Sequence, residues 1–267
     1  MNKTYYFLSG LPRSGSSMLS ALLNQNPNFY CGPSSPVVGS IIALEKSFEE
    51  NDLYTAFPKP KYKKAMAKAA LEEYYADVDK PIIFDKNRSW THRVEYIEKY
   101  FDIKDAKIIC TVRSIDEILA SFISLIHKSK AKKMNFIDKN LVNLKVPVND
   151  FTRCQYIASD GPLGRGFTGI ETALKNGFRK NLLLVEYDGL VSNPKDMMKK
   201  IYDFIDQPYY EHDFENIYNK QKEDDGKVYG LPDMHKVRAK VRKTARNPSE
   251  ILPPKVIEDV RGLEFWR

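Results

Sequence analysis

The sequence has few cysteines and no long apolar run. These two features exclude disulfide-rich proteins and proteins with a membrane span. The 267-residue chain has three cysteines, Cys31, Cys110 and Cys154, which cannot form a disulfide framework and do not have the spacing of metal ligands. No apolar run is long enough to cross a bilayer, and the apolar stretch at residues 4–8 is too short for the core of a signal peptide. We therefore expect a soluble, cytoplasmic protein with no membrane partner and no metal cofactor.

The sequence also has no linker rich in glycine, serine or proline and no internal repeat, so we expect one domain over residues 1–267. Short runs of strand type alternate with helical patterns, which predicts an α/β fold with a parallel sheet and helices on both faces. In such a fold, ligands bind at the carboxyl ends of the strands. The predicted strands cover residues 4–8, 81–84, 107–112 and 182–186.

A phosphate-binding loop is predicted directly after the first strand. A glycine-containing turn between a strand and a helix points backbone N–H groups and the positive end of the helix dipole at one place, which favours an anion. Gly10 and Gly15 have the spacing of the nucleoside-triphosphate P-loop, but Ser16 stands where that motif has its lysine. The only cation of the loop is Arg13, so we expect a different phospho-anhydride. The alternative is an ordinary turn with Ser14 or Ser16 as a helix cap, which requires neither the arginine nor so many hydroxyls.

This loop resembles that of a known enzyme family. Residues 12–17 match every position of P-[KR]-[ST]-G-[ST]-[ST], the 5′-phosphosulfate loop of sulfotransferases that use 3′-phosphoadenosine 5′-phosphosulfate (PAPS). The resemblance implies that PAPS is the cofactor. It also implies that the P-loop-like 5′-phosphosulfate loop consists of Pro12, Arg13, Ser14, Gly15, Ser16 and Ser17.

The stretch from this loop to Gly32 is similar to the opening of the tyrosylprotein sulfotransferases. In those enzymes a catalytic glutamate follows a Cys-Gly pair. Here Pro33, Ser34 and Ser35 follow the pair, so the family's base is not carried over. We therefore expect the acceptor to be a small hydroxylated molecule rather than a protein tyrosine.

A second motif follows the predicted strand at residues 107–112. Arg113 lies at the carboxyl end of that strand, and residues 114–117 have the spacing of a capping box, so a helix should begin there. Ser121 lies almost two turns beyond the cap and faces the side of the helix start, where it can meet the same ligand as Arg113. In sulfotransferases, an arginine and a serine with this spacing bind the 3′-phosphate of PAPS, and the resemblance implies that role here.

Two later segments are candidates for cofactor contacts. Tyr187 follows the predicted strand at residues 182–186 and resembles a family tyrosine near the nucleotide, although a tyrosine that only packs its ring is equally compatible. The basic run at residues 235–246 is expected over the 3′-phosphate, as a late basic loop is in the family, with Arg238 and Lys243 as contacts. The alternatives are a solvated basic helix or, given the net charge of +7, a nucleic-acid surface.

Sulfuryl transfer is an in-line displacement that depends on positioning and charge stabilisation. By its place in the family motif, Arg13 is predicted to stabilise charge on the leaving oxygen, and Lys86 is the second candidate. The acceptor also needs a group that takes its proton, for which Asp85 is the first candidate and His235 the second. Asp85, partnered by Lys86, is expected to stay ionised near neutral pH.

The sequence thus predicts an enzyme that transfers a sulfuryl group from PAPS to a hydroxyl acceptor, giving a sulfate ester and adenosine 3′,5′-bisphosphate (PAP). A P-loop nucleotide kinase is disfavoured by the missing lysine, and a nucleic-acid-binding module by the lack of aromatic residues in the basic run. The acceptor pocket is expected in residues 35–79 and 128–172. Within the second segment, the glycine-rich residues 161–166 are suited to a flexible lid, with an inert surface loop as the alternative.

Overall fold

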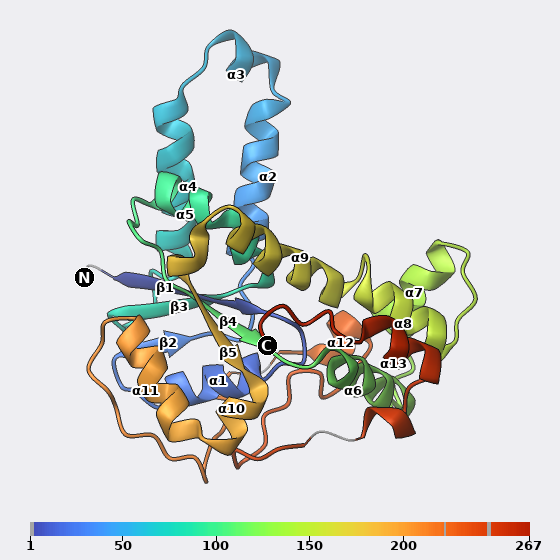
Figure 1. Cartoon of the computed structure of the whole chain (residues 1–267). Helices are drawn as coiled ribbons and strands as arrows, with labels where there is room; N and C mark the ends of the chain where they lie inside the picture. Colours follow the sequence, from blue (N-terminus) through green and yellow to red (C-terminus); the bar gives the residue numbers. More distant parts are fainter. Residues whose placement is uncertain (1–2, 222, 245–246) are drawn as a thin grey trace.

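A five-stranded parallel sheet lies at the centre of the computed structural model, which describes residues 3–221, 223–244 and 247–267 (Figure 1). In order across the sheet, the strands are β2 (Phe29–Cys31), β3 (Ile82–Lys86), β1 (Thr4–Gly10), β4 (Ile108–Val112) and β5 (Leu182–Glu186). Four of them lie where the sequence predicts strands, and the expected α/β class is confirmed. The three residues of β2 are too few to give an apolar or alternating pattern, so this strand was not predicted.

The strand side chains alternate between two apolar layers, because successive residues of a strand point to opposite faces of the sheet. Phe7 and Ile108 belong to one buried cluster, whereas their chain neighbours Leu8 and Ile109 belong to the other. Both faces are apolar, as expected of a parallel sheet that helices cover on both sides. The first cluster includes residues of α4 (Pro60–Tyr74), α5 (Val94–Phe101) and α9 (Pro162–Lys175), and the second includes residues of α1 (Ser16–Leu23) and α11 (Pro194–Phe204).

Two groups of helices extend from this core (Figure 1). An arm that projects from one side of the sheet is formed by α2 (Val37–Glu49), α3 (Asp52–Ala56) and α4. A second group consists of α6 (Ile115–Lys128), α7 (Phe136–Asn143), α8 (Asp150–Ala158) and α13 (Pro254–Val260). The other short helices are α10 (Tyr187–Ser192) and α12 (Asp225–Tyr229), with 3₁₀ turns η1 (Arg88–Arg93), η2 (Phe178–Asn181) and η3 (Pro248–Glu250). Among the residues described, no helix combines the length and the apolar character that a membrane span requires.

Residues 161–166 lead into and begin a helix, so the prediction of a flexible lid there is wrong. Pro162 occupies the first turn of α9, where its missing N–H costs no helical hydrogen bond. Gly166 is buried, and a Cβ atom added to it would lie 3.2 Å from the carbonyl oxygen of Gly10. The glycine therefore allows α9 to pack closely against the end of β1, beside the predicted phosphate loop.

Candidate active site

A cavity of about 850 Å³ opens at the carboxyl ends of the central strands, where a parallel sheet is expected to bind its ligand. Its wall is built from the end of β1 and the loop that follows, the end of β3, one side of α6, and the irregular segment before η3. A cavity of this size can enclose most of a nucleotide-sized ligand. The predicted residues that line it are Pro12, Arg13, Gly15, Ser16, Ser17, Lys86, Arg113, Ser121, Tyr187, His235 and Arg238.

The loop between β1 and α1 has the backbone conformation of an anion-binding turn. Gly10 has φ +117°, and a Cβ atom there would lie 2.2 Å from the carbonyl oxygen of Thr111, so only glycine fits. Arg13 and Gly15 also have positive φ values, of 57° and 93°, and Gly15 is the N-cap of α1. Such a turn directs consecutive N–H groups into one concavity, and the first N–H groups of the helix lack intrahelical acceptors.

Ser14 supports the loop instead of facing the cavity. Its buried hydroxyl donates to the carbonyl oxygen of Leu11 at 2.5 Å and lies 2.6 Å from Oγ1 of Thr111. Ser16 and Ser17 line the cavity, whereas Ser14 is absent from its lining. The Ser14 hydroxyl therefore connects the turn to β4. The hydroxyls of Ser16 and Ser17 are available to a ligand.

The predicted pair of Arg113 and Ser121 meets the phosphate loop directly. The Nε atom of Arg13 donates to Oγ of Ser121 at 3.1 Å, and Nη1 of Arg113 donates to the carbonyl oxygen of Arg13 at 2.9 Å. Nε of Arg113 also donates to Glu117 at 2.9 Å, which orients the guanidinium. Burial, reinforced by the charges of Arg113 and Arg238, lowers the pKa of Arg13 to about 10. Several cations thus converge on one end of the cavity, as a polyanionic ligand requires.

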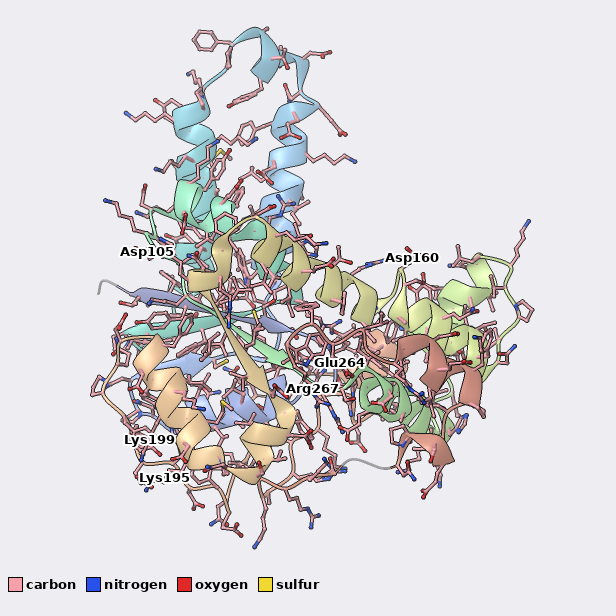
Figure 2. The ribbon with its side chains drawn as sticks, in the orientation of Figure 1. Asp105, Asp160, Lys195, Lys199, Glu264 and Arg267 are labelled. Atoms are coloured by element: carbon pink, nitrogen blue, oxygen red, sulfur yellow. The ribbon has the colours of Figure 1, made fainter. Side chains whose placement is uncertain are left out.

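Helix α6 begins where the sequence predicts, with Ser114 as its N-cap, but the capping box is not formed. The Ser114 hydroxyl is bonded to Asp116 at 2.5 Å and to Glu264 at 2.9 Å instead of to the helix backbone. Glu264 also accepts the N–H of Ile115 at 2.9 Å. Figure 2 shows Glu264 and Arg267 near the centre of the molecule, so the end of the chain caps α6 and holds the helix that carries Ser121.

Tyr187 packs its ring among its neighbours and also lines the cavity. Its ring lies under the Arg113 guanidinium, 4.1 Å from the carbon to the ring centroid, and 3.0 Å from a Cβ atom placed on Gly15. Its hydroxyl lies 3.2 Å from Oγ1 of Thr244. The buried ring therefore packs against both predicted phosphate-binding motifs while it also lines the cavity.

Residues 235–244 of the basic run cross the cavity as an irregular strap rather than as a helix. Arg238, Lys240 and Arg242 line the cavity. Lys243 does not line it: its ammonium lies 2.8 Å from Asp188, whose carboxylate raises the pKa of the lysine. Lys243 is thus engaged outside the cavity, and the last two residues of the basic run, 245–246, lie outside the described ranges.

Lys86 and Asp85 point in opposite directions, because they are neighbours on β3. Nζ of Lys86 donates to Oγ of Ser17 at 3.3 Å, within the cavity, and burial lowers the pKa of this lysine. Asp85 is fully buried on the other side, where its carboxylate accepts from Trp90 at 2.6 Å and from Tyr75 at 2.8 Å. Burial raises the pKa of Asp85. The prediction that Asp85 pairs with Lys86 and serves as base is therefore wrong.

His235 lines the cavity and is held by two carboxylates that the sequence analysis missed. Its Nδ1 lies 2.7 Å from Oδ1 of Asp225 and 2.5 Å from Oε2 of Glu223, and its backbone N–H donates to Oδ2 of Asp225 at 2.7 Å. The ligand atoms of this trio lie within 4.8 Å of one another, so the trio has the donor set of a metal site as well as of a hydrogen-bonded cluster. The acidic run at residues 223–225 was the signal that could have indicated these partners.

Comparison with known proteins gives a family and a set of folds. The model described as "Sulfotransferase family" matches residues 6–211. A curated relative, protein-tyrosine sulfotransferase A of Caenorhabditis elegans, is 20% identical over 215 residues, which are 77% of this chain and 50% of the relative. The chain thus spans about half the length of the curated relative that it matches.

Two solved structures have a similar fold. The sulfotransferase domain of the Synechococcus PCC 7002 olefin synthase has a TM-score of 0.56 and 18% identity, covering 97% of this chain and 94% of that one. The sulfotransferase domain from the curacin biosynthetic pathway has a TM-score of 0.51 and 14% identity, covering 79% of this chain and 76% of that one. At these sequence identities, the similarity shows a shared fold and no more.

Proposed function

Because the chain belongs to the sulfotransferase family, we propose that it transfers the sulfuryl group of PAPS to a hydroxyl acceptor, forming a sulfate ester and PAP. The observation that carries the proposal is the contact between the two predicted phosphate-binding motifs. Arg13 of the first motif bonds to Ser121 of the second, and Arg113 bonds back to the first loop. A ligand with phosphates at two separated positions, such as PAPS, matches this pair of sites better than a nucleotide with one phosphate chain.

The residues fit PAPS in two regions of the cavity. The turn that ends in Ser16 and Ser17, at the N-terminus of α1, suits the 5′-phosphosulfate. Arg113 and Ser121 suit the 3′-phosphate, with Tyr187 packed beneath the arginine. When bound, PAPS supplies the sulfuryl group and a phosphate leaving group.

Lys86 is the residue best suited to stabilise charge at the reacting end. Its ammonium lies beside Ser17 in a buried setting, where its charge acts more strongly than in water. The Arg13 guanidinium is instead directed to Ser121, and it also donates to the carbonyl oxygen of Met234. We therefore assign Arg13 to cofactor binding first and Lys86 to stabilising negative charge on the leaving phosphate oxygen.

His235 is the candidate proton acceptor that remains after Asp85 is removed. It lines the same cavity as Lys86, whereas Asp85 is bonded to Trp90 and Tyr75 within the core. A histidine beside the acceptor can take a proton from an alcohol or a phenol near neutral pH. The roles of Lys86 and His235 are thus separate: one stabilises negative charge and the other removes a proton.

The acceptor proposed here is a small hydroxylated molecule. The cavity continues beyond the phosphate-binding residues along apolar and aromatic side chains, namely Leu125, Phe136, Tyr156 and Tyr229. A protein tyrosine is the competing acceptor, and the name of the Caenorhabditis elegans relative favours it. No metal takes part in the proposed reaction.

The test is transfer from ³⁵S-labelled PAPS to a panel of aliphatic alcohols, phenols and a tyrosine-containing peptide. We expect label in the small hydroxyl compounds, PAP in equal amount, and no dependence on added metal. The Lys86→Ala variant should lose this activity. Label in the peptide alone would replace the proposed acceptor class, and consumption of ATP without any use of PAPS would reject sulfuryl transfer.

A further inference from the structure

The environment of the His235 ring determines which of its nitrogens can accept a proton. Nδ1 faces Asp225 at 2.7 Å and Glu223 at 2.5 Å, and both partners are acceptors when ionised. A neutral imidazole in this position carries its hydrogen on Nδ1. Among the residues described, no hydrogen bond engages Nε2, and the ring lines the cavity. The basic lone pair is therefore on the nitrogen that the carboxylates do not occupy.

Asp225 holds this ring in two ways. Its Oδ2 accepts the backbone N–H of His235 at 2.7 Å, while its Oδ1 accepts Nδ1–H. Because one carboxylate binds both the backbone and the ring of His235, it fixes the orientation of the ring relative to the backbone at the start of the strap. Tyr229 packs edge-on against the ring, with 5.6 Å between centroids, and limits its rotation.

Glu223 connects the ring to the reacting end of the cavity. Burial raises the pKa of its carboxyl group, but its polar interactions with His235 and Ser34 and the charge of Lys86 outweigh burial and lower the pKa overall. Ser34 lines the cavity, and the next residue, Ser35, donates its N–H to the carbonyl oxygen of Lys86 at 2.9 Å. Glu223 thus stays ionised, and its Oε2 faces Nδ1 of His235 at 2.5 Å.

We propose that Glu223 and Asp225 are positioning residues that keep Nδ1 of His235 protonated, so that Nε2 accepts the proton of the acceptor hydroxyl. The inference rests on the proposed sulfuryl transfer. In the step, the acceptor oxygen forms a bond to sulfur, its O–H bond breaks, and the proton goes to Nε2. The bond from sulfur to the leaving phosphate oxygen breaks with its electron pair on PAP. The two carboxylates stabilise the imidazolium that results.

The Asp225→Asn substitution tests this arrangement sharply. The single amide oxygen of an asparagine would be taken by the backbone N–H of His235, which leaves the NH₂ group facing Nδ1. That group donates, so it no longer favours Nδ1–H, and when Glu223→Gln is introduced as well, the ring tautomer with hydrogen on Nε2 is favoured and the lone pair is removed from the cavity. Asp224→Asn is the matched control, because Asp224 is exposed and an asparagine can still cap α12.

The experiment is ¹H–¹⁵N NMR of ¹⁵N-histidine-labelled protein, combined with transfer and PAP-binding assays on the same variants. The chain has four histidines, so His235→Gln identifies the His235 signals by their loss. We expect Nδ1–H on the neutral His235 ring of the wild type and of Asp224→Asn, and Nε2–H in the double variant Glu223→Gln/Asp225→Asn. Asp225→Asn and Glu223→Gln should reduce kcat for an aliphatic alcohol by about 10²-fold or more, with less loss for the acidic phenol 4-nitrophenol.

PAP affinity, measured by calorimetry, should stay at the wild-type value in Glu223→Gln and Asp225→Asn. A wild-type ring with Nε2–H, or equal losses of kcat on the alcohol and the phenol, would overturn the inference. An Nδ1–H signal that appears only after metal is removed by EDTA would make the trio a metal site and overturn it as well. Failure of the wild type to bind PAP would instead reject the proposed function, while the NMR result would still decide how the ring is held.

Discussion

The Nε atom of Arg13 lies 3.1 Å from the hydroxyl oxygen of Ser121, and this contact joins the loop after β1 to the middle of α6. The two residues are 108 positions apart in the sequence. Arg113 strengthens the junction, because its guanidinium bonds to the Arg13 carbonyl oxygen at 2.9 Å. One end of the cavity is thus assembled by contacts between the two motifs that we assign to the two phosphate-bearing positions of the cofactor.

Arg113→Ala and Ser121→Ala should each weaken PAP binding while the fold stays intact. A charge-assisted hydrogen bond to phosphate contributes about 1.5–3 kcal/mol, so we expect the larger loss for the arginine. Isothermal titration calorimetry measures the affinities, with the exposed Arg261→Ala as the control. Unchanged PAP affinity in Arg113→Ala would contradict the assignment of the 3′-phosphate site.

Lys86→Ala should lower kcat much more than it lowers PAP affinity, because the charge that this lysine meets grows in the transition state. Burial lowers the pKa of Lys86, so the protonated form is lost at a lower pH than for an ordinary lysine. As the pH is raised, the kcat/KM of the wild type should therefore begin to fall at a lower pH than the pKa of an ordinary lysine would predict. Steady-state kinetics against pH measures this, with the exposed Lys104→Ala as control; a full kcat in saturated Lys86→Ala would remove the lysine from the mechanism.

Asp85→Asn should retain turnover on both alcohols and phenols, because Asp85 is bonded to Trp90 and Tyr75 outside the cavity. Burial raises the pKa of this carboxyl group above its usual 3.8, so the folded state keeps the proton to a higher pH than the unfolded state does. The free energy of unfolding therefore declines as pH rises through this range, and the asparagine variant should lack that decline. Urea denaturation at several pH values gives the comparison.

A large loss of turnover with unchanged stability in Asp85→Asn would return Asp85 to the mechanism. Asp85→Ala provides a structural contrast. It leaves the Tyr75 hydroxyl and the Trp90 N–H without their acceptor, at a cost of about 1–3 kcal/mol for each buried group. That variant should be clearly less stable than Asp85→Asn.

His212 should make the fold sensitive to acid. Burial lowers its pKa from 6.5 to about 4, and its Nε2 lies 3.1 Å from the hydroxyl of Tyr202. Because the unfolded state binds the proton first as pH falls, the stability is complete above about pH 6.5 and is lost progressively toward pH 4. Between these two pH values, the free energy of unfolding should fall by about 2 kcal/mol less in His212→Gln than in the wild type. Denaturation at the two pH values measures the difference. The same acid dependence in the variant would show that other groups cause it.

The sheet and the proximity of the two proposed phosphate-binding motifs could be predicted because their signals are local. Apolar runs mark β1, β4 and β5, and the residues at their carboxyl ends must share one edge of a parallel sheet. The same reasoning predicts that Arg13, Arg113 and Ser121 lie close together, as their hydrogen bonds confirm. The spacing of glycines and serines predicts the turn between β1 and α1.

The carboxylate partners of His235, the second candidate base, could not be predicted in the same way, because these residues lie in irregular segments. Asp225 and His235 are ten positions apart around the start of a five-residue helix and a turn, so no periodic pattern relates them. Asp85 was chosen because it is next to Lys86 in the sequence, although alternation along a strand makes such neighbours diverge. The resemblance to a late basic loop of the family predicts Lys243 as a cofactor contact, but its ammonium pairs with Asp188.

The most direct test of the central claim is calorimetric titration of the metal-free protein with PAP, adenosine 5′-monophosphate, ATP with magnesium, and an oligonucleotide. The account predicts that PAP binds in a one-to-one complex, and that loss of the 3′-phosphate in adenosine 5′-monophosphate weakens binding by about 1.5–3 kcal/mol or more. ATP with magnesium and the oligonucleotide should bind weakly or not at all. Magnesium-dependent binding of ATP that is tighter than binding of PAP, or equal affinity for PAP and adenosine 5′-monophosphate, would contradict it.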